Sequence, residues 1–346
     1  MKNSTNEVRR FFAAANGFNG FRSNFDELFS HEGIDKLFIL KGGPGTGKST
    51  LMRKLSGKYK NKCEVTEILC SSDVNSLDGV IIEREGKRVA VADGTAPHVI
   101  EPQFPGAFER IVNLGDGFDY DGLMARSERI ISLASSKKEA YRKAYDALRI
   151  AGDIQKYIMR YCFETGIKKK AEFLAQQLLT EISNSCFGSA NNKFLLSSFS
   201  KDGFTKLPYS VENKKEITIK GDGLCEYLLT SSLRQKADEA GLAKSIYTSP
   251  LSESMIDLLE TENIIFKVAS ENAHDADIVF SLGNNIEYES LKLRYDAFIK
   301  EAQEAFKEAS IYHFELEDIY SGKTSFEHNG VVEETISKDI SAFLEK

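Results

Sequence analysis

The sequence has no tryptophan, few prolines, few cysteines and no long apolar segment. No stretch approaches the roughly 18 consecutive apolar residues that a transmembrane helix requires. The opening residues, MKNSTNEVRRFF, lack the apolar core of a signal peptide. The five cysteines are odd in number and include no C-x-x-C pair, which argues against a disulfide framework and against a zinc site. We therefore expect a cytoplasmic protein with reduced thiols and without a membrane partner.

A surplus of positive charge is also missing. The chain has 45 Lys and Arg against 52 Asp and Glu, a net charge of −7. Because non-specific nucleic-acid binding depends on clustered Lys and Arg, nucleic acid is not an expected partner. The densest basic run, Lys168–Lys170, is interpreted as a solvated helix face. The 346 residues, 41% of them hydrophobic, are enough for two globular domains.

The strongest motif is GGPGTGKS at residues 42–49, which matches the P-loop (Walker A) pattern G-x-x-x-x-G-K-[ST]. It follows an apolar strand predicted at Leu37–Leu40 and precedes a helix predicted at Ser49–Tyr59. Glycines let the backbone turn its N–H groups toward an anion, and the helix N-terminus adds a positive dipole end. The residues predicted to bind a nucleotide are Gly42, Gly43, Pro44, Gly45, Thr46, Gly47, Lys48, Ser49 and Thr50.

Within this motif, Lys48 is expected to reach the β- and γ-phosphates, and the Ser49 hydroxyl is expected to bind Mg²⁺. A second metal-organising acid is predicted at Asp93, which ends the apolar strand VAVAD. The alternative is that Asp93 only caps a turn. The expected cofactors are ATP and Mg²⁺.

No glutamate follows Asp93, although many P-loop ATPases use one there to activate water; Gly94 and Thr95 stand in that place. Turnover is then slow, or the base comes from elsewhere. The leading candidates for this base are Asp73, at the end of a predicted parallel strand, and His98, in DGTAPH. Together with Lys48 and Asp93 they make up the predicted catalytic residues. Asp78 is a third candidate. For each of the three, a structural turn contact is the alternative.

The order of strands and helices predicts an α/β fold of tandem P-loop-like domains, each with a mostly parallel sheet flanked by helices, and with long helical arms. Residues 186–346 repeat the element order of residues 10–165, which indicates an internal duplication. The predicted boundaries are an active core at 1–120, a helical arm at 121–185, a degenerate core at 186–285 and a C-terminal arm at 286–346.

The second copy lacks what the first copy has. In KGDGLCEYLL, residues 220–229, the Lys and the Ser/Thr are gone and the loop is shorter. Asp222 and Glu226 place negative charge where phosphate would bind, and Ala269 aligns with Asp93. One nucleotide site is therefore expected. Arg234 and Arg294 are candidates for an arginine donated to it.

Each of the two arms contains a set of helix-spaced alanines. The preferred interpretation is that these two alanine faces pack against each other and pair the two halves as an intramolecular pseudo-dimer. The alternative is a surface for an unknown protein or small-molecule partner. His313, Glu315 and Glu317 could hold a metal, but a solvated helix face is the preferred interpretation. The alanine sets are Ala144, Ala147 and Ala151, and Ala302, Ala305 and Ala309.

With GGPGTGKST, CSSDVNSLDGVII and DGTAPH in this tandem layout, nearly the whole chain resembles a family of bacterial tandem P-loop ATP-binding proteins. The resemblance implies ATP binding without naming a substrate. Members can carry a P-loop in both halves, and this sequence departs from that at 221–228.

The sequence is compatible with three functions. The first is a Mg²⁺-dependent ATPase that couples the nucleotide to its helical arms. The second is a small-molecule or nucleotide kinase. The missing glutamate and the proline-containing loop at 98–108 favour it, and the lack of an Arg-rich lid argues against it. The third is a nucleotide-sensing scaffold without turnover. ATP is preferred over GTP because no N-K-x-D motif is present.

Overall fold

The protein is a mixed α/β protein with two mixed sheets and long helices. The computed structural model describes residues 8–164, 166–182, 191–221, 225–269, 276–280 and 286–345. The described chain forms two compact units. Unit 1 contains the chain through Ala14, Ser23–Arg142 and Ala305 onward, and unit 2 contains Ala15–Arg22 and Lys143–Glu304.

Unit 1 is built on a six-stranded sheet in the order β1-β5-β6-β7-β4-β8. Strand β4 is parallel to both of its neighbours, β7 and β8, and β1 is parallel to β5. The strands are β1 (Arg9–Phe12), β4 (Lys36–Lys41), β5 (Glu64–Leu69), β6 (Leu77–Arg84), β7 (Lys87–Asp93) and β8 (Glu109–Asn113).

The expectation of a mostly parallel sheet is met in part: the sheet is mixed, because β6 is antiparallel to both β5 and β7, whereas the other three pairings are parallel. Only Glu85 and Gly86 connect β6 to β7, with φ of 53° and 82°. Two residues of positive φ form a tight hairpin turn, whereas a parallel connection needs a crossover of a dozen or more residues. Strand β5 still runs in the same direction as β4 and β7, so their carboxyl ends share one edge of the sheet.

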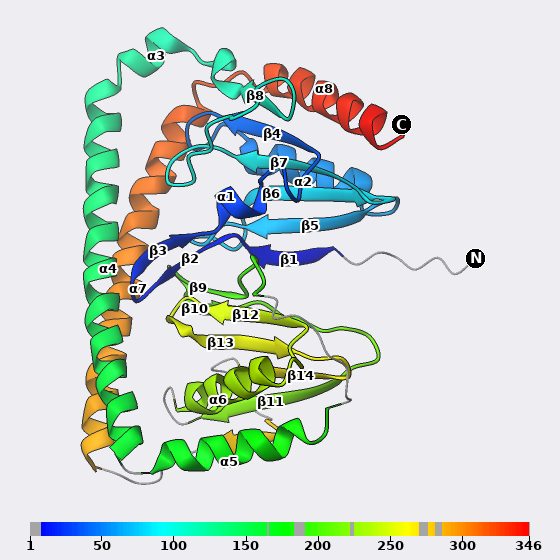
Figure 1. The fold of residues 1–346 in the computed structure, drawn as a ribbon. Helices are drawn as coiled ribbons and strands as arrows, with labels where there is room; N and C mark the ends of the chain where they lie inside the picture. The colour runs from blue at the N-terminus through cyan, green and yellow to red at the C-terminus, as the bar shows by residue number, and fades with distance from the viewer. Residues whose placement is uncertain are drawn as a thin grey trace. The chain divides into compact units, whose positions relative to one another are not determined.

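Helices cover this sheet within unit 1 (Figure 1). Helix α2 packs against β5 and β6, and it also contacts α8. Buried Leu51, Met52 and Leu55 form its inner face. The helical elements are α1 (Phe25–Leu28), α2 (Lys48–Tyr59), the 3₁₀ turn η1 (Leu114–Gly117), α3 (Tyr120–Met124), α8 (Phe326–Leu344), and the unit 1 parts of α4 (Ser127–Glu164) and α7 (Ile286–Ser321).

Unit 2 contains a five-stranded sheet in the order β12-β13-β14-β11-β15, together with two short hairpins. Helices α5 and α6 pack on each other, and α6 also packs on the sheet. The elements are β2 (Ala14–Gly17), β3 (Gly20–Ser23), β9 (Ser197–Ser200), β10 (Gly203–Lys206), β11 (Lys215–Gly221), β12 (Ser245–Ser249), β13 (Ser252–Glu260), β14 (Ile264–Val268), β15 (Ile278–Phe280), α5 (Ile167–Leu179) and α6 (Glu226–Glu239).

The second sheet repeats the order and the directions of β5-β6-β7-β4-β8. The pairing registers also define equivalent positions. Leu40 lies opposite Asp93 in the first sheet, and Ile219 lies opposite Val268 in the second. The position equivalent to Asp93 is therefore Val268, one residue before the predicted Ala269. Neither residue is acidic.

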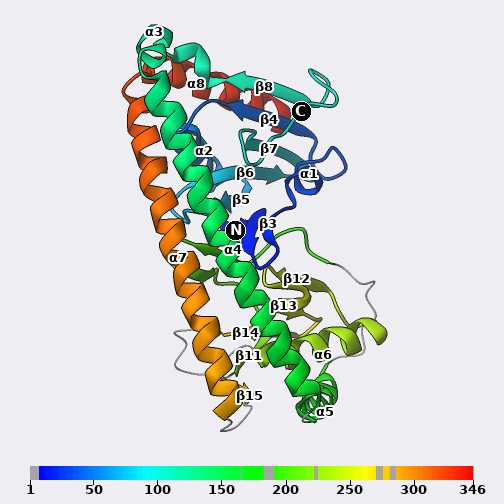
Figure 2. The ribbon, with the colours of Figure 1, turned by 90° about the vertical axis from the view of Figure 1, so that its left-hand side faces the viewer.

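The long helices α4 and α7 each contribute residues to both units. Within unit 1, the first turns of α4 and the last turns of α7 lie side by side (Figures 1 and 2). Arg129 is ion-paired with Glu315 there, and Tyr141 packs edge-on against Phe306. The six helix-spaced alanines are all buried. Among the helices that the structure describes, none combines the length and the apolar composition of a membrane-spanning segment.

Candidate functional site

The residues of the glycine-rich motif lie together in unit 1, at the carboxyl end of β4. The glycine-rich loop, Gly42–Gly47, connects β4 to α2, and Lys48 is the first residue of α2. Gly45 and Gly47 have φ of 68° and 84°, a conformation that L side chains rarely adopt. The sequence-based prediction of a strand, a loop and a helix is confirmed here, with bounds that differ by one residue.

Lys48 is held inside this loop. Its side chain is 10% exposed, and Nζ donates to the carbonyl oxygens of Gly42 and Gly43 at 2.9 and 2.8 Å. The Thr46 hydroxyl also donates to the Gly43 carbonyl, at 2.8 Å. The loop thus surrounds a fixed positive charge, with the N-terminus of α2 beside it.

Asp93 lies next to Lys48 because β7 pairs with β4 in parallel. Its Oδ2 atom is 3.6 Å from Lys48 Nζ. Its Oδ1 atom accepts hydrogen bonds from the Thr95 amide, at 2.9 Å, and from the Thr95 hydroxyl, at 2.6 Å. Burial raises the pKa of the Asp93 carboxyl, while Lys48 and Thr95 oppose that rise. Asp93 therefore both caps the turn and offers an oxygen toward Lys48.

Ser49 and Thr50 differ in their surroundings. Ser49 Oγ accepts a hydrogen bond from the Leu77 amide at 2.9 Å, which fixes the hydroxyl beside the start of β6. Thr50 is exposed on the surface of α2. Within the part of the chain that the structure describes, no three His, Cys, Asp or Glu residues form a cluster that could hold a metal ion. Ser49 and Asp93 remain the predicted metal ligands.

The other predicted acids and His98 lie in two separate arrangements. Asp73 follows β5, and its Oδ1 accepts the Asn75 amide at 3.1 Å, as in an Asx turn. His98 is 7% exposed, and its Nε2 lies 3.1 Å from Asp78 Oδ2. The His98 ring also stacks on Phe25, with ring centroids 4.2 Å apart. The structure thus pairs His98 with Asp78 and gives Asp73 a role in its own turn.

A part of unit 1 far along the chain contacts the glycine-rich loop. This C-terminal corner, residues 317–329, runs from the end of α7 to the start of α8. Asn329 Nδ2 donates to the Thr46 carbonyl at 2.8 Å. Cβ atoms built on three of the loop glycines would each meet this corner. A Cβ on Gly43 would lie 2.8 Å from the Tyr320 ring, and one on Gly45 would lie 2.4 Å from the Glu317 backbone oxygen. A Cβ on Gly47 would lie 3.2 Å from Asn329 Nδ2.

Glu317, at the start of the corner, and His313, one turn earlier on α7, both lie in the electrostatic environment of Lys48. Burial raises the pKa of Glu317, and Asp73 raises it further, while Lys48 opposes the rise. Burial and the neighbouring Lys137 and Lys48 lower the pKa of His313 to about 4. His313 Nε2 lies 3.5 Å from Glu317 Oε1.

His313 and Glu317 were expected on a solvated helix face. Their i, i+4 spacing puts them on one face of α7, but no sequence signal indicates that this face meets residues 42–47.

The equivalent region of unit 2 is arranged differently. Cys225 is buried, and its Sγ donates to the Phe280 carbonyl at 2.8 Å. Glu226 begins α6, and a Cβ atom built on Gly221 would lie 2.3 Å from Glu226 Oε2. Asp222 lies outside the described residues. The prediction that this copy binds no nucleotide stays a prediction.

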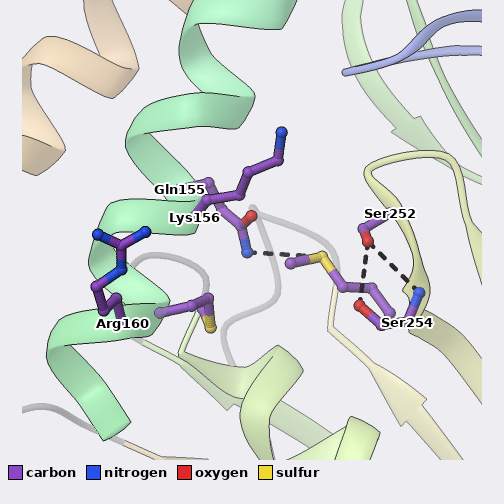
Figure 3. A pocket seen from close by; sticks show the side chains of 7 residues that line it. Gln155, Lys156, Arg160, Ser252 and Ser254 are labelled. Atoms are coloured by element: carbon purple, nitrogen blue, oxygen red, sulfur yellow. Dashed lines mark hydrogen bonds between the residues drawn. The ribbon is translucent and has the colours of Figure 1, made fainter. Parts of the chain in front are cut away.

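Unit 2 also contains an open cleft of about 430 Å³ between α4 and β13 (Figure 3). Gln155 Nε2 donates to Met255 Sδ at 3.8 Å. Lys156 forms an ion pair with Asp153, at 3.0 Å. The cleft does not involve the residues of the glycine-rich loop. Its lining is Gln155, Lys156, Met159, Arg160, Ser252, Ser254 and Met255.

No protein-family model, curated protein or solved structure matches this chain. The glycine-rich loop and its surroundings in unit 1 are therefore the basis for assigning a function.

Proposed function

We propose that unit 1 binds Mg²⁺-ATP at the glycine-rich loop and hydrolyses it, as a P-loop NTPase. The observation that carries this proposal is the placement of Lys48 and Asp93. Lys48 Nζ and Asp93 Oδ2 lie 3.6 Å apart, because Asp93 ends β7 and Lys48 begins α2, just after the loop that follows the neighbouring parallel strand β4. A P-loop needs this combination of a lysine for phosphate oxygens and a nearby acid for the metal.

The roles of the residues follow from this arrangement. The loop amides and Lys48 bind the phosphates, which requires Lys48 Nζ to exchange its carbonyl partners for phosphate oxygens. Ser49 and Asp93 hold Mg²⁺, directly or through water. The metal would neutralise charge that develops on the phosphoryl oxygens. Asp73 is the remaining candidate to position water, because His98 is already paired with Asp78.

Transfer to an acceptor other than water is the second candidate function. The observation in its favour is that the Thr95 hydroxyl and amide both donate hydrogen bonds to Asp93. Thr95 follows Asp93 by two residues, in the segment where many ATPases have a water-activating glutamate. A small-molecule or nucleotide kinase would not need that glutamate.

The test is phosphate release from Mg²⁺-ATP by the purified chain, beside Lys48→Ala and the control Lys54→Ala. Lys54 lies on the same helix, is largely exposed and pairs with Glu333. We expect Lys48→Ala to abolish release and Lys54→Ala to leave it unchanged. ADP formation without free phosphate, only in the presence of one nucleoside or nucleoside monophosphate, would indicate a kinase. Absence of Mg²⁺-ATP binding would refute both functions.

A further inference from the structure

An aromatic ring lies beside the glycine-rich loop at the start of α8. Phe326 is 53% exposed, and a Cβ atom built on Gly47 would lie 3.6 Å from its ring atom Cε1. A ring with one edge against the loop and more than half of its surface open offers a π-face to a planar partner. Gly47 immediately precedes Lys48, so the ring lies next to the part of the loop proposed to hold phosphates.

Asn329 holds this end of α8 against the loop. Its Nδ2 atom donates to the Thr46 carbonyl at 2.8 Å, which fixes the orientation of the amide and leaves Oδ1 as its other end. Asn329 follows Phe326 by three positions, so both side chains lie on one face of the helix, and both meet the Cβ position of Gly47. The hydrogen bond to Thr46 therefore sets the position of Phe326 relative to the loop.

Two polar atoms at this end of α8 are buried without a hydrogen-bond partner among the residues that the structure describes. They are Asn329 Oδ1 and His328 Nε2. A buried polar atom without a partner is costly, and most such atoms in native proteins are satisfied. Of the two residues, Asn329 lies on the face of α8 that carries Phe326. Its Oδ1 atom is an acceptor that lacks a donor, and a ligand beside the ring would supply one.

We propose that this end of α8 binds the base of the nucleotide whose phosphates occupy the glycine-rich loop, with the Phe326 ring stacked on the base and Asn329 Oδ1 accepting a hydrogen bond from it. This inference rests on the proposed function and identifies the base-binding part of that same site. The base is adenine, because its 6-amino group donates a hydrogen bond where guanine has an accepting oxygen. Asn329 Oδ1 is covered in the structure, so the Phe326 ring must shift as it stacks on the base.

The test is the dissociation constant of three Mg²⁺ complexes, those of ATP, GTP and inorganic tripolyphosphate, measured by calorimetry on the full chain. Tripolyphosphate carries the phosphate chain of ATP without a base. Stacking of a base on an aromatic side chain corresponds to about 5- to 100-fold in binding. We expect Phe326→Ala to bind ATP about 5- to 100-fold more weakly and tripolyphosphate with wild-type affinity. Phe326→Tyr keeps an aromatic ring and should retain most of the ATP affinity.

Val331→Ala is the matched control, because Val331 is an apolar residue of the same helix and is 63% exposed. It follows Phe326 by five positions, which places it about 140° around the helix. All three affinities should be unchanged in this variant.

Asn329→Ala separates the two roles of this residue. Loss of one hydrogen bond to the base should lower the preference for ATP over GTP by about 2- to 10-fold. Loss of the contact with Thr46 alone would instead weaken the binding of ATP, GTP and tripolyphosphate by one common factor.

Failure of base binding at α8 differs from failure of the proposed function. Wild-type ATP affinity in Phe326→Ala, or an equal loss for ATP and tripolyphosphate, would overturn base binding at α8 and leave the NTPase proposal standing. Equal wild-type affinity for ATP and GTP, or one common loss for all three ligands in Asn329→Ala, would also overturn it. If the wild type binds neither Mg²⁺-ATP nor Mg²⁺-tripolyphosphate, the NTPase proposal fails and base binding fails with it.

Discussion

Gly45→Ala tests how tightly the C-terminal corner is packed on the glycine-rich loop. Gly45 has a φ of 68°, and the left-handed region costs an alanine about 1–2 kcal/mol. The new Cβ atom would also lie 2.4 Å from the Glu317 backbone oxygen and 2.9 Å from its Cα atom. Neither atom belongs to a flexible side chain, so backbone must move. Overpacking of this kind costs about 1–3 kcal/mol, which makes the expected total about 2–5 kcal/mol.

The assay is urea unfolding of Gly45→Ala beside the control Gly57→Ala, with hydrogen exchange of residues 317–329. Gly57 lies in α2, and a Cβ atom built there meets nothing within 4 Å. Alanine at a helix position should raise the free energy of unfolding by about 0.5–1 kcal/mol. Gly45→Ala should lower it, or should speed exchange in the corner if the corner detaches first. Wild-type stability together with wild-type exchange in Gly45→Ala would refute the reasoning.

Two further predictions concern other contacts of unit 1. His313 has a pKa lowered to about 4 from 6.5, so the folded state resists its protonation, and the free energy of unfolding should fall as the pH drops from about 6.5 to about 4. With 39% of the side chain exposed, solvent screening limits the loss to about 1–2 kcal/mol. Urea unfolding at about pH 4.5 and about pH 7.5 should show a smaller difference for His313→Gln, and an equal difference would contradict the assignment. Tyr59 is buried, and its hydroxyl donates to the Ser337 carbonyl at 2.8 Å, so Tyr59→Phe should cost about 1–2 kcal/mol by the same measurement; a cost near zero would contradict this.

The sequence was sufficient to predict those elements whose signals lie close together along the chain. The pattern at residues 37–59 predicted β4, the loop and α2 because strand, glycine and helix signals follow each other along the chain. The helical arms predicted at 121–185 and 286–346 were marked by helix-spaced alanines, and they contain the long helices α4 and α7. Asp93 was predicted from its position at a strand end, and the parallel pairing of β4 with β7 brings it to Lys48.

The sequence was not sufficient to predict strand direction, strand register or contacts between segments far apart in the chain. The mixed sheet depends on the two-residue turn at Glu85 and Gly86. The one-residue difference between Ala269 and Val268 is in a sheet whose β12–β13 ladder shifts register near Thr248. Such a shift depends on which residues pair across the ladder, which a comparison of residue types alone does not show. The contact of the corner at 317–329 with the glycine-rich loop was not predicted, because it joins residues far apart in the chain. The composition of the corner gives no indication that it packs on this loop.

The way the chain alternates between the two units has a consequence for biosynthesis. Unit 1 takes its sheet and glycine-rich loop from the first part of the chain and its corner from residues after Ala305, and Lys143–Glu304 of unit 2 lie between them. During translation, the ribosome must therefore deliver most of unit 2 before unit 1 can close over its own loop. Until then, the nascent chain carries the glycine-rich loop without the contacts that Glu317, Tyr320 and Asn329 make with it in the folded protein.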